Sequence, residues 1–140
     1  MKVFLDTNVW ASAFGSRGIC QDLLELLLGE PGVRAFRLLT CEQVKAETLR
    51  TLRDKFRVSS AGLAAATAVL ADVEAVDVFN CPPLPAGFPD ADDWPILCAA
   101  IAARADMIVT GDKALLALEA IEGLPIVDPR TAYLRLRGLA

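Results

Sequence analysis

The chain begins with a short apolar run that ends in a carboxylate. Val3, Phe4 and Leu5 are apolar at consecutive positions, and Asp6, Thr7 and Asn8 follow them directly. A short strand without polar positions is typical of the middle of a parallel sheet, because helices cover both faces of such a sheet. This run therefore predicts an α/β fold. It also raises the question of why a strand built for burial ends in an acid.

The rest of the chain alternates short apolar segments with helical ones. Residues 20–32 predict a helix closed by Gly29 and a turn at 31–32. Thr40 and Gln43 have capping-box spacing at the start of the next helix. We expect further strands over 33–40, 75–79, 106–110 and 124–128, and further helices over 40–56, 59–73, 96–105 and 129–140. The order predicts a three-layer α/β/α sandwich around a mostly parallel sheet. The 140 residues fit one domain, 1–140.

Charge and composition restrict the chemistry that is possible. The net charge is −4 and the chain contains no histidine. The acidic balance argues against a simple basic nucleic-acid binder. Without histidine, any acid–base or metal chemistry must depend on carboxylates.

The cysteine spacing and the hydropathy predict the cellular compartment of the protein. The four cysteines, Cys20, Cys41, Cys81 and Cys98, lie far apart and form no Cys-x-x-Cys pair. We expect reduced thiols in a cytoplasmic protein, with no disulfide frame and no zinc site. We expect no signal peptide before Lys2, and no apolar run in the sequence reaches the roughly 18 residues that a membrane helix needs.

Four acids are expected at one edge of the sheet, because ligands of open α/β sheets bind at the carboxyl ends of the strands. Asp6 ends the first strand, and Asp112 follows the strand that ends near Thr110. Asp93 precedes a helix, and Glu47 lies one to two turns into another. The helix register alone does not choose Asp93 over the neighbouring acids at positions 90 and 92.

Carboxylates that converge repel one another, and a divalent cation removes the conflict. Mg²⁺ or Mn²⁺ suits such oxygen ligands, and either ion can activate water and stabilise charge on a phosphate. Taken singly, each acid also has a structural interpretation. Asp6 and Asp112 could be caps, and Glu47 could be a surface residue.

Other residues have a structural and a functional interpretation. Trp94 is more typical of a core anchor than of a base-stacking platform. The apolar run at 23–28 is either core or an interface. The basic residues Arg50, Arg53 and Lys55, together with Lys113, are candidate RNA contacts, although such charges are usually solvated.

Several motifs together resemble the PIN-domain nucleases, and the resemblance covers nearly the whole chain. The residues that carry it are FLDTNVWASAF, CEQVKAETLRTLRDKF, PDADDWPILCAAIAARADMIVTGDKALLAL and GLPIVDPRTAYLRL. Within this family, the chain is similar to the VapC-like toxins of bacterial toxin–antitoxin pairs. The resemblance implies an Mg²⁺- or Mn²⁺-dependent endoribonuclease, a cognate antitoxin and a homodimer. Carried over by position, Asp6, Glu47, Asp93 and Asp112 are the catalytic, metal-binding quartet, with Asn8 and Thr110 in support.

Two other classes compete with this interpretation. A non-catalytic RNA- or protein-binding module would show no metal-dependent cleavage. Phosphatases that form an aspartyl phosphate place a second aspartate two residues after the first, and that position is Asn8 here.

Overall fold

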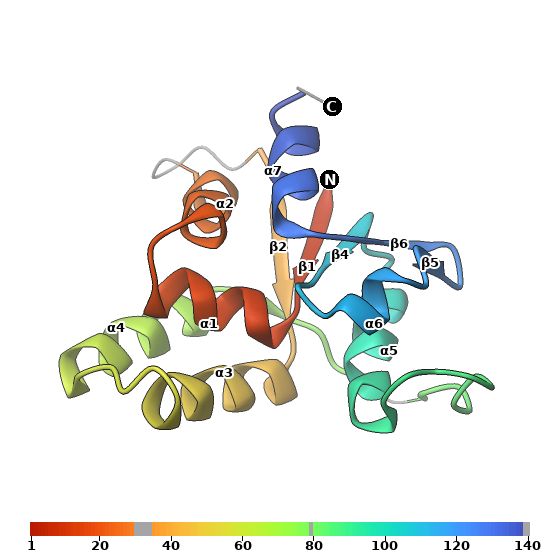
Figure 1. Ribbon diagram of the computed structural model, residues 1–140, viewed down its shortest axis with the longest axis horizontal. Helices are drawn as coiled ribbons and strands as arrows, with labels where there is room; N and C mark the ends of the chain where they lie inside the picture. The colour runs from red at the N-terminus through yellow and green to blue at the C-terminus, as the bar shows by residue number, and fades with distance from the viewer. Residues whose placement is uncertain (30–34, 79, 139–140) are drawn as a thin grey trace.

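A single mixed sheet forms the centre of the molecule. The computed structural model describes residues 1–29, 35–78 and 80–138 (Figure 1). Within them, six strands follow the order β3-β2-β1-β4-β6-β5, and every pair is parallel except β5 with β6. The strands are β1 (Lys2–Leu5), β2 (Arg37–Thr40), β3 (Glu74–Ala75), β4 (Met107–Val109), β5 (Ala120–Ile121) and β6 (Leu124–Val127).

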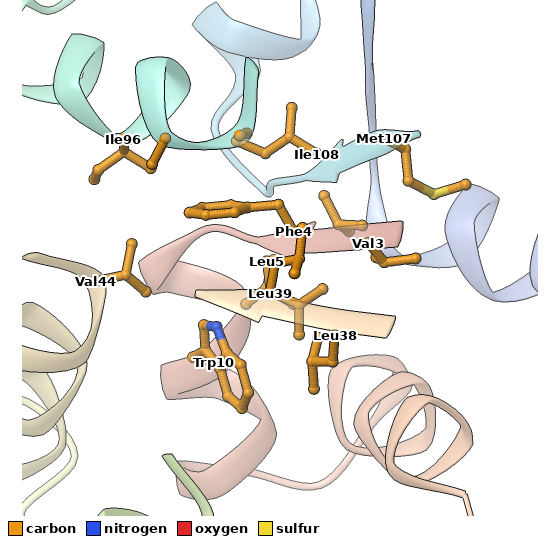
Figure 2. Packing of buried hydrophobic residues seen from close by; sticks show 14 of the residues in the cluster. Val3, Phe4, Leu5, Trp10, Leu38, Leu39, Val44, Ile96, Met107 and Ile108 are labelled. Carbon is orange, nitrogen blue, oxygen red and sulfur yellow. The ribbon is translucent and has the colours of Figure 1, made fainter. Parts of the chain in front are cut away.

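Helices cover both faces of this sheet. In the described residues they are α1 (Thr7–Gly15), α2 (Ile19–Leu28), α3 (Glu42–Asp54), α4 (Ser60–Ala71), α5 (Trp94–Ala102), α6 (Lys113–Leu116) and α7 (Pro129–Leu136), with a short 3₁₀ turn η1 (Ala91–Asp93) before α5. Helices α1 and α2 lie on one face of β1 and β2, and α5 lies on the other (Figure 2). The expected three-layer α/β/α sandwich is confirmed.

The first strand is central, which explains its composition. β1 pairs with β2 on one side and with β4 on the other, and Val3, Phe4 and Leu5 are fully buried. The Phe4 ring lies on the α5 side of the sheet, near Ile96, and Trp10 of α1 packs below the opposite face (Figure 2). Because successive strand residues point to opposite faces, a strand covered on both sides needs apolar side chains throughout.

Most expected elements are present, with shorter bounds. Ser59 caps α4 by accepting a hydrogen bond from the Gly62 amide, Gly29 ends α2 with φ 66°, and Pro129 begins α7. The expected turn at 31–32 lies outside the described residues, as do positions 33–34, 79 and 139–140 of the expected elements. Of the apolar run at 23–28, Leu23, Leu24 and Leu27 are buried in the core.

Three expectations about local structure are wrong. Residues 7–15 form helix α1, although the sequence pattern predicts no helix before residue 20. The Thr40–Gln43 capping box does not form, because Thr40 belongs to β2, its buried hydroxyl makes no hydrogen bond with the described residues, and Cys41 is the residue that precedes α3. The strand expected over 75–79 is reduced to the two residues of β3.

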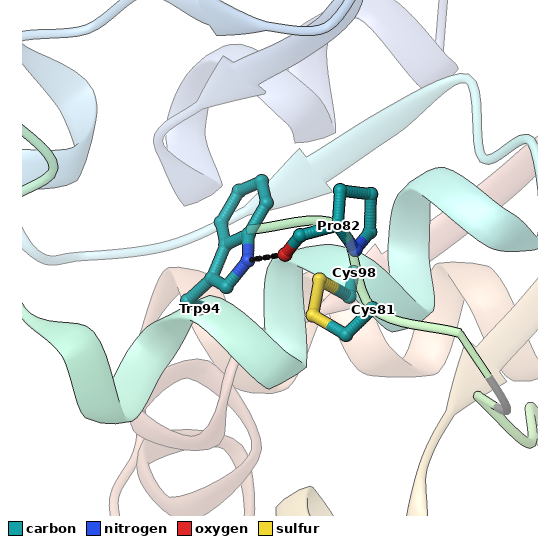
Figure 3. The surroundings of a disulfide bond; sticks show 4 residues. All are labelled: Cys81, Pro82, Trp94 and Cys98. Atoms are coloured by element: carbon teal, nitrogen blue, oxygen red, sulfur yellow. Dashed lines mark hydrogen bonds between the residues drawn. A yellow bond between two sulfur atoms is a disulfide. The ribbon is translucent and has the colours of Figure 1, made fainter. Parts of the chain in front are cut away.

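The expectation of four reduced thiols is also wrong. Cys81 and Cys98 form a disulfide that joins the proline-rich loop before η1 to the buried side of α5 (Figure 3). Cys20 and Cys41 are free. Trp94 is the core anchor that its type predicts, since it is buried and its indole N–H donates to the Pro82 carbonyl at 2.7 Å. Among the described residues, each helix falls short of the length and apolar character that a membrane crossing requires.

Candidate active site at the carboxyl edge of the sheet

One cavity collects the four acids that the sequence singles out. It has a volume of about 340 Å³, and Asp6, Glu47, Asp93 and Asp112 all line it. Each acid comes from a different part of the chain: the end of β1, the middle of α3, the end of η1 and the start of α6. The parallel topology brings them together, because β1 and β4 are neighbours and end at the same edge.

Asp6 is the most buried of the four, with 5% of its surface exposed. Its backbone N–H donates to the Val109 carbonyl of β4 at 2.9 Å, which fixes it beside the neighbouring strand. Its Oδ1 accepts the Thr7 amide at 2.8 Å, so it also caps α1. The structural interpretation of Asp6 as a cap is therefore correct, and the same side chain still faces the cavity.

A polar network holds the second oxygen of Asp6. The Thr110 hydroxyl donates to Asp6 Oδ2 at 2.8 Å, and Asn8 Nδ2 donates to the same atom at 3.1 Å. Asn8 Nδ2 also donates to Thr110 Oγ1, and Asn8 Oδ1 accepts the Gly111 amide at 2.8 Å. Asn8 and Thr110 thus hold the Asp6 side chain in place.

Glu47 reaches the cavity from α3 and is held at both oxygens. Thr7 Oγ1 donates to its Oε2 at 3.1 Å, and Gln43 Nε2 donates to its Oε1 at 3.1 Å. The same Gln43 amide donates to the Asp92 carbonyl at 3.1 Å. Gln43 therefore links the Glu47 side chain to the backbone of η1, the turn that ends in Asp93.

Asp93 is distinguished from its acidic neighbours by position. Asp90 is exposed and caps η1 through the Asp92 amide, and Asp92 is exposed. Of these three acids, Asp93 alone lines the cavity. Burial raises the pKa of Asp93 to about 6, and the negative charges of Asp6, Asp90, Asp112 and Glu47 add to the effect.

Asp112 caps α6 and is half-buried. Its Oδ1 accepts the amides of Ala114 at 2.8 Å and Leu115 at 3.3 Å. Its own amide donates to Thr110 Oγ1 at 3.1 Å, so the network around Asp6 continues to Asp112. Both interpretations of Asp112 hold geometrically, since the capping residue also borders the cavity.

The charges in this cavity destabilise one another, and a cation would relieve them. Burial raises the pKa of Asp6, with smaller upward effects from Asp112 and Glu47 that act against its hydrogen bonds. As they stand, no three of the described acidic, cysteine or histidine side chains are close enough to hold one ion. The donors are nevertheless all carboxylate oxygens, which is the ligand set that Mg²⁺ and Mn²⁺ prefer.

The candidate RNA contacts separate into two groups. Lys55 lines the cavity, where it is the one basic side chain among the described lining residues. Arg53 instead forms an exposed ion pair with Asp54 at 2.7 Å. Arg50 and Lys113 are exposed and do not line this cavity.

Several further residues of the site were missed in the sequence, among them polar and aromatic ones. Thr7 and Gln43 position Glu47, and Ser12 and Phe56 line the cavity. Gln43 carried a detectable signal, because it precedes Glu47 by one helical turn and such pairs lie on one face. Thr7 and Ser12 could be placed only by recognising that residues 7–15 are helical.

Comparison with known families agrees with this geometry. The family model of the PIN domain matches residues 2–114, which include all four acids. No individually curated protein matches the chain.

Proposed function

Because the chain belongs to the PIN domain family, whose members are generally nucleases, we propose that it is a metal-dependent endoribonuclease. The observation that carries the proposal is the single cavity lined by Asp6, Glu47, Asp93 and Asp112. These residues come from four separate elements, and helix capping accounts for Asp6 and Asp112 but not for Glu47 and Asp93.

The four carboxylates would hold Mg²⁺ or Mn²⁺. When bound, such an ion lowers the pKa of a coordinated water and stabilises the charge that develops on a phosphate. The raised pKa values of Asp6 and Asp93 support the assignment, because they report unfavourable negative charge that a cation would offset.

The remaining side chains of the site orient these carboxylates. Thr110 and Asn8 donate to Asp6 Oδ2, and these hydrogen bonds fix the orientation of the Asp6 side chain toward the cavity. Thr7 and Gln43 do the same for Glu47 from two sides. Preorganised ligands of this kind avoid reorganisation during the reaction.

The reaction is the hydrolysis of a phosphodiester bond in RNA. Water adds across one P–O bond, which leaves a phosphomonoester on one fragment and a hydroxyl on the other. The protein has no histidine to act as a base, so the carboxylate site must supply the chemistry. Lys55 would contact a substrate phosphate at the border of the cavity.

The biological setting is a finer proposal, which rests on the resemblance to VapC-like toxins. We propose a cytoplasmic toxin component, with a cognate antitoxin that blocks the acidic cavity and with a second copy of the chain as a homodimer partner. A basic antitoxin segment would suit a cavity with four carboxylates. Co-expression with the product of the neighbouring gene tests the antitoxin, and sedimentation tests the dimer.

A digest of single-stranded RNA tests the activity. The wild-type protein should cleave with Mn²⁺ or Mg²⁺ and stop with a chelator. Asp6→Asn should abolish cleavage and keep the fold at reduced stability, because asparagine is also a good N-cap, while its amide nitrogen cannot accept the Thr110 and Asn8 hydrogen bonds that Oδ2 accepts. Asp92→Asn is the matched control, since Asp92 is exposed and does not line the cavity.

Two other outcomes would replace the proposal. RNA binding without cleavage at any metal concentration would indicate a non-catalytic module. Hydrolysis of p-nitrophenyl phosphate without RNA cleavage would indicate a phosphatase. Wild-type turnover by Asp6→Asn would show that the site is assigned wrongly.

A further inference from the structure

A second cavity adjoins the acidic one. It has a volume of about 370 Å³ and is lined by Asn8, Ser12, Cys20, Gly111, Asp112 and Pro129. Three of these residues, Asn8, Ser12 and Asp112, also line the acidic cavity. The two cavities are therefore adjacent, and the side chains of the first turns of α1 and the start of α6 form the border between them.

The lining of the second cavity differs in chemistry from that of the first. Among its described lining residues, Asp112 is the one carboxylate, and none carries a positive charge. Cys20 and Pro129 contribute a thiol and a pyrrolidine ring, and Gly111 contributes backbone. Such a surface offers little to a phosphate, but it suits an uncharged ring with polar edges.

The Asn8 amide of this lining is already engaged. Its nitrogen donates within the protein, to Asp6 Oδ2 and Thr110 Oγ1, and its oxygen accepts the Gly111 amide. The Asp112 amide and Oδ1 are likewise occupied. The Ser12 hydroxyl, the Cys20 thiol and Asp112 Oδ2 remain available, but none of them is the amide or guanidinium group that reads a base edge with two hydrogen bonds, so an occupant would be recognised mainly by shape.

We propose that the second cavity is a subsite for the nucleoside next to the scissile phosphate of single-stranded RNA. This inference rests on the proposed function, because it assigns the scissile phosphate to the acidic cavity. The Lys55 side of that cavity then receives phosphate charge, and the Cys20 side receives the neutral sugar and base. The volume lies within the range of about 300–1,000 Å³ that is usual for small-molecule sites. The subsite should show little preference among the four bases.

Cys20 provides a direct probe of the subsite. It is half-buried, Cys41 is buried, and Cys81 and Cys98 are joined in the disulfide, so a maleimide should react at Cys20. Burial raises the pKa of the Cys20 thiol, so the reaction is best followed at mildly alkaline pH. Mass spectrometry of wild type and Cys20→Ser identifies the modified position.

The experiment measures the rate of alkylation with and without tetranucleotide RNA, in Ca²⁺ to limit cleavage. Fluorescence anisotropy measures the dissociation constant of the same RNA. At a concentration ten times that constant, the RNA should slow alkylation roughly tenfold, because only free protein reacts. All four homopolymer sequences should protect, and inorganic phosphate should not.

A second test fills the proposed subsite with a large side chain. Cys20→Trp should weaken tetranucleotide binding about tenfold, which corresponds to about 1.4 kcal/mol, while the melting-temperature shift caused by Mn²⁺ remains. Leu84→Trp is the matched control, because Leu84 is exposed and lines neither cavity.

The outcomes separate this inference from the proposed function. Unchanged alkylation at saturating RNA, or a tetranucleotide that does not bind, overturns the subsite even if RNA cleavage is observed. Protection of Cys20 in a protein that cleaves no RNA supports the subsite and contradicts the proposed hydrolysis alone.

Discussion

Thr110 donates a hydrogen bond to Asp6 at 2.8 Å across 104 residues of sequence. The Thr110 hydroxyl also accepts from Asn8 Nδ2 at 3.2 Å and from the Asp112 amide at 3.1 Å. One donor and two acceptor positions exhaust what a hydroxyl offers. The buried Thr110 side chain therefore connects two of the proposed metal ligands.

Replacing this hydroxyl should damage both stability and activity. Thr110→Val keeps the shape of the side chain but leaves the Asp112 amide without its acceptor and removes the hydroxyl that donates to Asp6. We expect a loss of about 1–3 kcal/mol in the free energy of unfolding and weaker Mn²⁺ binding. Thr110→Ser retains the hydroxyl and is the control. Denaturant unfolding and calorimetry measure the two quantities, and equal behaviour of both variants would contradict the assigned role.

The metal-free protein should lose stability as the pH rises through the folded-state pKa of Asp93. That pKa is raised to about 6, whereas an unfolded aspartate titrates near about 3.9. The folded state therefore holds the proton longer than the unfolded state. The protonated Asp93 therefore contributes its full stabilisation below the pKa of the unfolded state. This stabilisation is lost as the pH rises through the pKa of the folded state. Asp6, whose pKa is also raised, acts in the same direction.

Asp93→Asn removes the titrating carboxyl group and should therefore reduce this pH dependence of stability. In a chelator at pH 7 the variant should melt at a higher temperature than wild type, and its melting temperature should vary less between about pH 4 and 6. Added Mn²⁺ should stabilise wild type more than the variant. Asp92→Asn is the control, because Asp92 is exposed and does not line the cavity. A variant that melts below wild type in chelator would show that Asp93 carries no electrostatic penalty.

Lys55 should contribute affinity for RNA without base preference. Lys55→Ala should weaken binding of all sequences alike and reduce the slope of log K against log salt by about 1. Arg53→Ala is the matched control, because Arg53 is paired with Asp54 at the surface. Anisotropy titrations at several salt concentrations measure the slope. An unchanged slope for Lys55→Ala, or a greater change for Arg53→Ala, would assign the phosphate contact elsewhere.

The disulfide should stabilise the loop that leads to Asp93. Cys81 and Cys98 are 17 residues apart, and closure of a loop of this size contributes about 3 kcal/mol in the chain-entropy description. A dithiol reductant should lower the stability of wild type by about that amount and should have no such effect on Cys81→Ser. If reductant leaves the melting temperature of wild type unchanged, the bond does not support the fold in solution.

The sequence predicts the outline of this molecule better than its details. The consecutive apolar residues Val3–Leu5 could belong only to a covered strand, and the central position of β1 follows from that. Helix α1 was not predicted, because Asp6, Thr7 and Asn8 are residue types that favour turns. The helix is stabilised by the burial of Val9 and Trp10 against the sheet. The Thr40–Gln43 spacing predicted a capping box that does not form, because Thr40 is the last residue of β2 and pairs with β3.

The site was predictable as a set of residue types but not as a set of contacts. Asp6 and Asp112 follow from strand ends, because parallel strands end at one edge. The selection of Asp93 over Asp92 depends on η1, and the link from Gln43 to the Asp92 carbonyl joins segments 49 residues apart. The Cys81–Cys98 pair likewise depends on a loop that returns to α5, which cysteine spacing alone does not reveal.

The central claim is that Asp6, Glu47, Asp93 and Asp112 share a divalent cation. Crystals soaked in Mn²⁺ and measured near the manganese absorption edge test it most directly. The account predicts an anomalous peak in the acidic cavity, in contact with oxygens of Asp6 and at least one other member of the set, and no such peak in Asp6→Asn. A well-occupied peak elsewhere with an empty cavity, or an unchanged peak in Asp6→Asn, would contradict it.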